Sequence, residues 1–171
     1  MKRCFSGIVI GLVFIGACRP ATEKIGPAEL YWLMNRASWS GDEIAVEMLL
    51  KAGADPDGER DYRAFHQSSY QRGFEPSWPL NLAAYGGHAA VVRLLLRAGA
   101  KAHAPEDEGQ TALTMAAERG HLEVARLLLQ AGAIRSHRGP GPRGCDGTAE
   151  EIARCAGHPT VADAIRDFGS K

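Results

Sequence analysis

Apolar and polar positions alternate most clearly between Leu122 and Gln130. Leu, Val and Ala occupy one broad side of a helical projection of this segment, and Glu123, Arg126 and Gln130 lie at i, i+3 and i+7 on the other side. This spacing predicts a short amphipathic helix with one buried face. Gly132 follows closely, and a glycine at this place commonly ends a helix in a left-handed turn.

The same pattern recurs along the chain. Each of three segments ends in large apolar residues, one polar residue and Ala-Gly-Ala, with the glycines at Gly53, Gly99 and Gly132. The last two glycines are 33 residues apart, whereas the first two are 46 apart, an interval longer by 13. We therefore expect similar helix pairs that stack and share a core, with an insertion between the first two.

A second marker is a Gly-His pair at the start of each second helix. The three histidines, His88, His121 and His158, recur once per repeat and so spread along the stack instead of converging. Metal or catalytic chemistry would need them close together. The pattern instead predicts structural caps of the second helices, and we expect no metal site.

The residues around these markers resemble the ankyrin repeat, whose pattern reads T-P-L-H-x-A-A, then G-H, a leucine-rich helix and A-G-A-D. Trp78 to Ala84 and Thr111 to Ala117 match the first part, and Ala52 to Asp55 matches the last. The resemblance covers about residues 28–168 and implies an all-α solenoid of about four helix-turn-helix repeats. The repeats are expected at about 28–57, 76–108, 109–141 and 146–168, with the insertion at 58–77. The first and last repeats are atypical, as expected of caps that show one face to water.

The first 17 residues predict a signal peptide. Lys2 and Arg3 precede an uncharged, mostly apolar run from Phe5 to Ala17. A helix of this length rises about 20 Å, which is too short for a hydrocarbon core of about 30 Å. A basic start, a short apolar centre and small residues at the end are typical of secretion.

Residues Ile15-Gly16-Ala17-Cys18 resemble the lipobox of bacterial lipoproteins. The resemblance implies cleavage before Cys18, acylation of Cys18, and a linker over residues 18–27 that leads to the repeats. Residue 19 is Arg rather than Asp, which in that family favours an outer-membrane address facing the periplasm. An ordinary cleaved signal and an uncleaved anchor are the alternatives.

Two surfaces are candidates for binding a partner. The insertion carries aromatic residues interleaved with arginines, namely Tyr62, Phe65, Tyr70 and Phe74. Such residues dominate interface hot spots, although they could equally pack on the first two repeats. The second surface is a column of equivalent positions that end the first helices: Trp39, Tyr85, Glu118 and Cys155. The ankyrin resemblance places this column in the inner groove, so Trp39, Tyr85 and Glu118 are candidate contacts, with ordinary partial burial as the alternative.

Two neighbouring repeat tips differ in charge. One is acidic, with Glu106, Asp107 and Glu108, and the next is basic, with Arg135, His137, Arg138 and Arg143. Tips of opposite sign could set a partner's orientation, or they could simply be solvated.

Cys145 and Cys155 are the thiols that remain in the mature chain besides Cys18. An oxidising compartment would permit a disulfide between them. Cys155 should lie about 10 Å along a helix that begins near Thr148. A bridge therefore needs the loop of Cys145 to fold back until the two Cα atoms are within about 7 Å, and pairing stays open at this point.

Composition narrows the function further. Basic and acidic residues balance at 20 each, which differs from the concentrated basic surface of nucleic-acid-binding proteins. No phosphate loop, metal-ligand spacing or nucleophile motif is present in the sequence. We expect a monomeric, non-catalytic module without a cofactor, which binds a periplasmic protein partner and touches the membrane only through Cys18. The roles that fit are an accessory factor in oxidative-stress defence, an immunity protein that blocks a periplasmic toxin or enzyme, and, less well, a secreted effector that binds host proteins.

Overall fold

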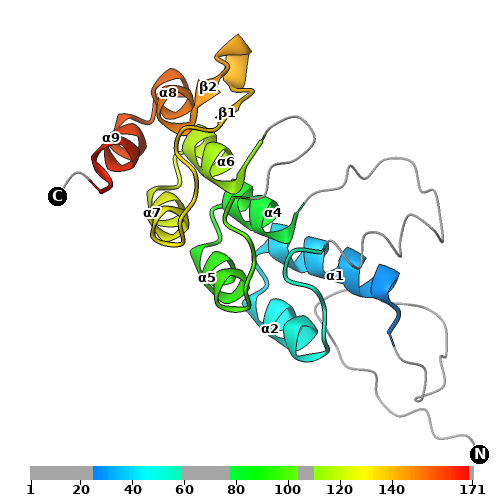
Figure 1. Cartoon of the computed structure of the whole chain (residues 1–171). Coiled ribbons are helices and arrows are strands. Elements are labelled where there is room, and N and C mark those ends of the chain that lie inside the picture. The colour runs from blue at the N-terminus through cyan, green and yellow to red at the C-terminus, as the bar shows by residue number, and fades with distance from the viewer. Residues whose placement is uncertain (1–24, 59–77, 104–109, 170–171) are drawn as a thin grey trace, which may run out of the picture.

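The computed structural model describes residues 25–58, 78–103 and 110–169. These residues form eight α-helices, one 3₁₀ turn and two very short strands (Figure 1). The helices come in four successive pairs: α1 Pro27–Ser40 with α2 Glu43–Lys51, α4 Pro79–Gly86 with α5 Ala89–Arg97, α6 Ala112–Arg119 with α7 Leu122–Gln130, and α8 Ala149–Cys155 with α9 Pro159–Asp167.

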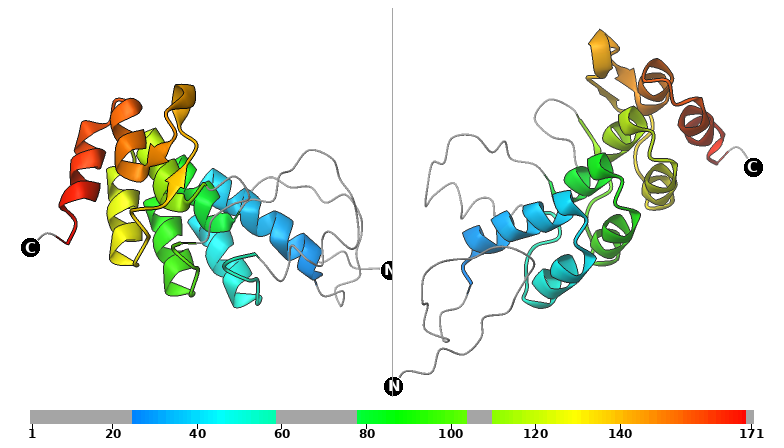
Figure 2. Two further views of the ribbon diagram at one scale, coloured as in Figure 1. Left: turned by 45° about the horizontal axis from the view of Figure 1, so that its top comes forward. Right: turned by 180° about the vertical axis from the view of Figure 1, so that it is seen from behind.

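The first helices of the pairs form one row and the second helices form another. In the first row α1 packs on α4, α4 on α6 and α6 on α8, and in the second row α2, α5, α7 and α9 pack in the same order. Figure 1 shows the two rows side by side, and Figure 2 shows from behind how they follow one another along the stack. The all-α solenoid expected from the sequence is confirmed, and each pair contacts mainly its neighbours.

The core runs between the two rows. Alanines such as Ala84 and Ala117 are fully buried in the first helices, where their small side chains let adjacent helices approach closely. The second helices contribute larger side chains, and Leu95, Leu128 and Ile165 are also fully buried. One helix pair has too little apolar surface to fold alone, so burial of these side chains between pairs stabilises the stack.

Tight turns join the two helices of the first three pairs. α1, α4 and α6 end at Gly41, Gly87 and Gly120, which have φ angles of 73°, 76° and 78°. A side chain with a Cβ rarely adopts this left-handed conformation, so glycine is favoured at each turn. Threonines begin two of the first helices, because Thr111 and Thr148 cap α6 and α8 with reciprocal side-chain hydrogen bonds.

The three histidines of the Gly-His pairs lie at the N-cap positions, as predicted, although none of them caps its helix through its side chain. His88 precedes α5, His121 precedes α7 and His158 precedes α9. Nε2 of His88 lies 2.9 Å from the carbonyl oxygen of Trp39, and Nε2 of His121 lies 3.0 Å from that of Tyr85. An imidazole ring is longer than the side chain of a typical N-cap residue, and here it reaches the preceding repeat.

A hydrogen bond also links the loops that follow α2 and α5, on either side of the insertion in the sequence. The backbone N–H of Lys101, after α5, donates a hydrogen bond of 2.7 Å to the carboxylate of Asp57, after α2. Asp57 therefore joins the first two repeats directly, although 19 residues between them, 59–77, lie outside the described ranges.

The connection between α7 and α8 contains a ladder that the sequence did not predict. β1 Arg138–Gly139 pairs antiparallel with β2 Gly147–Thr148, and the 3₁₀ turn Pro142–Gly144 lies between them. Two-residue strands carry too little alternation to be read from a sequence. The ladder leaves the fold class unchanged.

Several predictions concern residues outside the described ranges. They are the signal peptide over 1–17, acylation of Cys18, the aromatic residues Tyr62, Phe65, Tyr70 and Phe74, and the acidic tip at 106–108. These stay predictions. Among the helices that the structure does describe, none is long and apolar enough to cross a membrane.

Candidate functional site

The column of equivalent positions brings two aromatic rings together. Trp39 lies in the last turn of α1 and Tyr85 in the last turn of α4, and their ring centroids lie 5.4 Å apart with an interplanar angle of 19°. The solenoid causes this contact, because residues at the same place in adjacent first helices face the same side. Trp39 stays 54% exposed, which is unusual for a large apolar side chain in contact with another ring.

Arg119 extends this contact into the third repeat. Its guanidinium carbon lies 3.8 Å from the ring centroid of Tyr85, within the range of a cation–π interaction. We call Trp39, Tyr85 and Arg119 the aromatic stack. Sequence reasoning selected Glu118 in this repeat and missed Arg119. Glu118 is half-buried, whereas Arg119 is exposed. A basic residue next to a column that already holds two aromatic rings is the signal that could have identified it.

A second cation–π contact lies within α1. The guanidinium carbon of Arg36 is 5.2 Å from the ring centroid of Trp32, one helical turn away. Trp32 is 37% exposed, and sequence reasoning had not selected either residue. Within residues 25–58, 78–103 and 110–169, neither Arg36 nor Arg119 forms an ion pair. A guanidinium group can donate hydrogen bonds to a carboxylate or a phosphate of a partner.

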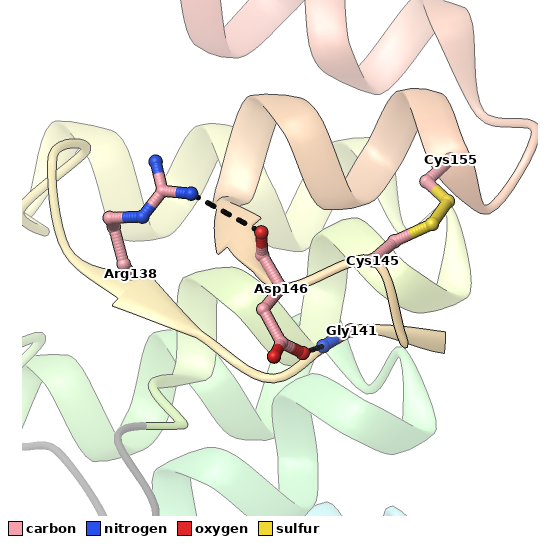
Figure 3. Close-up of a disulfide and its surroundings, with 5 residues drawn as sticks. All are labelled: Arg138, Gly141, Cys145, Asp146 and Cys155. Carbon is pink, nitrogen blue, oxygen red and sulfur yellow. Dashed lines mark hydrogen bonds between the residues drawn. A yellow bond between two sulfur atoms is a disulfide. The ribbon is translucent and has the colours of Figure 1, made fainter. Parts of the chain in front are cut away.

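The fourth position of the column is used differently. Cys155, at the end of α8, forms a disulfide with Cys145, and their Cα atoms are 6.4 Å apart (Figure 3). The loop of Cys145 does fold back, as a bridge requires. Figure 3 also shows Asp146, whose side chain accepts a hydrogen bond of 3.4 Å from the backbone of Gly141 and whose carbonyl accepts one of 3.3 Å from Arg138. These bonds and the disulfide hold the loop against α8.

Comparison with known protein families decides the class. A family model for ankyrin repeats in three copies matches residues 33–138. The chain belongs to the ankyrin-repeat family. A search of curated proteins found no match to it. Ankyrin repeats form protein–protein interaction modules, and the family is typically non-catalytic.

Basic residues at the last ankyrin tip are partly engaged in the fold. Nη1 of Arg135 donates to three carbonyls at the end of α9, the shortest bond being 2.9 Å to Phe168. Arg138 forms an ion pair of 3.1 Å with Glu151. A hydrogen bond from the backbone of Thr148 lowers the pKa of the Glu151 carboxyl, and the charge of Arg138 lowers it further. Arg135 and Arg138 therefore stabilise the terminal repeat instead of standing free for a partner.

The same tip contains a hollow of about 350 Å³, lined by Arg135, Ser136, Thr148, Glu150, Ile165 and Arg166. Most of its polar side chains already have partners, because Thr148 caps α8, Arg135 caps α9 and Arg166 pairs with Asp163 at 2.9 Å. In the part of the chain that the structure describes, no group of three or more His, Cys, Asp or Glu residues could hold a metal ion. Among the described residues, the aromatic stack is thus an exposed surface whose side chains can still bind a partner.

Proposed function

We propose that the chain is a lipid-anchored envelope protein whose ankyrin repeats bind a protein partner through the aromatic stack and perform no catalysis. The observation that carries this proposal is the exposed stack itself. Trp39, Tyr85 and Arg119 come from three successive repeats and meet on the face formed by the first helices. Tryptophan, tyrosine and arginine are the residue types that dominate interface hot spots.

Three features of the stack favour recognition over a purely structural role. The stack lies on the first helices, whereas the core that holds the repeats together lies between the two rows. Trp39 leaves about half of its surface in water. Arg119 forms no ion pair with a described carboxylate, and its contact with the Tyr85 ring restrains the side chain, so it loses less conformational entropy on binding.

The N-terminal sequence supports the proposed location in the cell envelope. Cys18 closes a lipobox-like segment, and Arg19 favours the outer membrane over retention in the inner membrane. The Cys145–Cys155 disulfide is compatible with this address, because such bonds persist in oxidising compartments such as the periplasm. We propose that the repeats face the periplasm and that the partner is a periplasmic or envelope protein.

The binding role is tested by crosslinking and capture from membranes with Trp39→Ala. Ile134→Ala is the matched control, because Ile134 is 52% exposed and Trp39 is 54% exposed, and Ile134 lies outside the stack. We expect Trp39→Ala to reduce capture about tenfold or more, the effect of losing one interface hot spot, and Ile134→Ala to leave it unchanged. Equal capture by all three chains would show that the stack is not the binding site.

The anchor is tested separately by incorporation of labelled fatty acid. The wild-type chain should incorporate label and Cys18→Ala should not. A wild-type chain without label would disprove the anchored address and leave the binding test untouched.

A further inference from the structure

Exposed apolar residues are concentrated at one end of the solenoid. Of the seven large apolar side chains that are exposed within the described residues, five belong to the first repeat and its entry: Ile25, Trp32, Trp39, Ile44 and Met48. The other two, Ile134 and Phe168, lie in the second half of the chain. Terminal repeats usually present a polar outer face to water, so an apolar first repeat points to something that covers it.

Repeat equivalence shows which way Ile44 and Met48 face. Their equivalents in α5 are Ala90 and Leu94, 46 residues later, and these two residues line a groove of about 240 Å³ together with Glu43 of α2. That side of α5 therefore faces the preceding repeat. The same side of α2 has no described repeat before it, and Ile44 is accordingly 72% exposed and Met48 39% exposed.

The first helix of the repeat shows the same side to solvent. Arg36 in α1 is exposed, whereas its equivalents Leu82 in α4 and Met115 in α6 are buried. This difference is expected of a position that a preceding helix would cover. Trp32 shares that side, because the guanidinium of Arg36 lies over its ring. We call Trp32, Arg36, Ile44 and Met48 the end face.

The lipid anchor brings the end face close to the bilayer. This step rests on the proposed acylation of Cys18. Ile25, the first described residue, is seven residues after Cys18, and seven extended residues span about 25 Å at most. Such a short tether gives the first repeat a high effective concentration at the membrane, so a weak apolar contact is enough to hold it there.

We propose that the end face rests on the lipid surface, so that the solenoid stands with its first repeat at the membrane and its disulfide-bonded last repeat away from it. The chemistry of the face suits this interface. Tryptophan is enriched at the level of the lipid headgroups, and a guanidinium above it can bind lipid phosphate. Glu47, beside the face, is neutralised by Lys51 at 2.6 Å, which limits its repulsion of anionic lipid. Figure 2 shows that α1 and α2 lie at one end of the stack and α9 at the other.

The test is hydroxyl-radical footprinting of the acylated full-length mature chain on vesicles of phosphatidylethanolamine and phosphatidylglycerol. The readout is the modification rate of Trp32, measured by mass spectrometry, with Phe168 as an internal reference at the far end. The double variant Ile44→Asp/Met48→Asp removes the apolar contact and leaves the anchor in place. Ile134→Asp is the matched control, and all three substituted side chains are exposed, so the fold should be retained.

We expect Trp32 to be modified about threefold faster in the double variant than in the wild type, because a side chain at the bilayer interface is shielded from water. Ile134→Asp should match the wild type. Equal rates in all three acylated chains would disprove contact of the end face with lipid. Shielding that increases with the protein-to-lipid ratio would show that a second copy of the chain covers the face, and would also overturn the proposal.

The same mass spectra separate this inference from the proposed anchor. An N-terminal peptide without acyl chains would disprove the anchor and with it the basis of the contact. An acylated peptide with an unshielded Trp32 would disprove only the contact.

Discussion

A left-handed glycine and a histidine of the next repeat form the smallest unit that joins two repeats. Gly87 turns the chain after α4 with a φ of 76°, and a Cβ placed on it would lie 2.6 to 2.9 Å from atoms of the His121 ring. The same ring bonds to the carbonyl oxygen of Tyr85. Glycine is therefore needed at this position both for its backbone conformation and for the space that the ring occupies.

Gly87→Ala should destabilise the fold more than Gly99→Ala. Gly99 also has a positive φ, 97°, but nothing lies within 4 Å of a Cβ placed there. Left-handed strain alone costs about 1–2 kcal/mol, which is the effect expected for Gly99→Ala. Gly87→Ala must in addition displace the His121 ring and break a bond between repeats, at a cost of about 1 kcal/mol or more. Urea unfolding of the two variants measures the difference, and equal losses would show that the ring adapts freely.

Stability should fall in mild acid because of His121. Burial lowers the pKa of this imidazole, and the charges of Arg119, His88 and His158 lower it further. The unfolded chain therefore binds a proton at His121 more readily than the folded chain does. The free energy of unfolding is then fully retained above about pH 6.5, the ordinary pKa of histidine, and decreases as the pH falls below it.

Urea unfolding at pH 7.5 and pH 5.5 tests this dependence, with His121→Gln as the control. Glutamine does not titrate, and its amide can still donate to the carbonyl of Tyr85. The difference in stability between the two pH values should shrink in His121→Gln. A difference as large as that of the wild type would assign the acid sensitivity to other groups.

The sequence located these residues but not their bonds. Recurrence of the Gly-His pair identifies His88 and His121 as structural, because it repeats with the helices. Their acceptors are backbone carbonyls of Trp39 and Tyr85, which carry no signal in residue type. Arg119 was missed for a related reason, because its contact with Tyr85 depends on the stacking of two repeats.

At the scale of single elements, α8 is stabilised at both of its ends by interactions other than the packing of helices. It has seven residues, too few for a stable isolated helix. Thr148 and Glu151 cap its first turn, and the disulfide from Cys155 to Cys145 fixes its last. These devices add to the packing that α8 receives from α6 and α9.

Removing the disulfide with Cys145→Ser/Cys155→Ser should destabilise the last repeat. The bridge closes a loop over a sequence separation of 10 residues, and cross-links of this size stabilise by about 2–3 kcal/mol through the unfolded chain. Hydrogen exchange should become faster in α8 and α9 and stay unchanged in α1 and α2. Reduction of the wild type should reproduce the effect and leave the double variant unaffected. Faster exchange along the whole chain would contradict a local role.

Helix positions were predictable from sequence to the extent that they repeat. The pattern of α5 and α7 recurs at a fixed interval, and the residues of each pair lie where that interval predicts. The connection between α7 and α8 differs, because β1, β2 and the 3₁₀ turn occur once and are held by the disulfide and by Asp146. A feature without a second copy gives no periodic signal, and Cys145 by itself left its pairing open.

At the scale of the whole molecule, stability should depend on the position of a defect along the stack. Each repeat contacts mainly its neighbours, so an end repeat can open alone, whereas an inner repeat couples both halves. Leu95 in α5 and Ile165 in α9 provide a matched pair, because both are fully buried aliphatic side chains of second helices.

Leu95→Ala and Ile165→Ala should each cost about 2–5 kcal/mol locally, through lost burial and the cavity left behind. Hydrogen-exchange rates measured for each helix should show how far along the stack each substitution acts. Ile165→Ala should accelerate exchange in α8 and α9 and leave α1 and α2 unchanged, because an open last repeat removes contacts only from its neighbour. Leu95→Ala should accelerate exchange in every helix, since the first repeat cannot bury its face without α4 and α5. If Ile165→Ala instead accelerates exchange in α1 and α2 as much as in α9, the repeats unfold as one unit and the free energy of the stack is not a sum over neighbouring pairs.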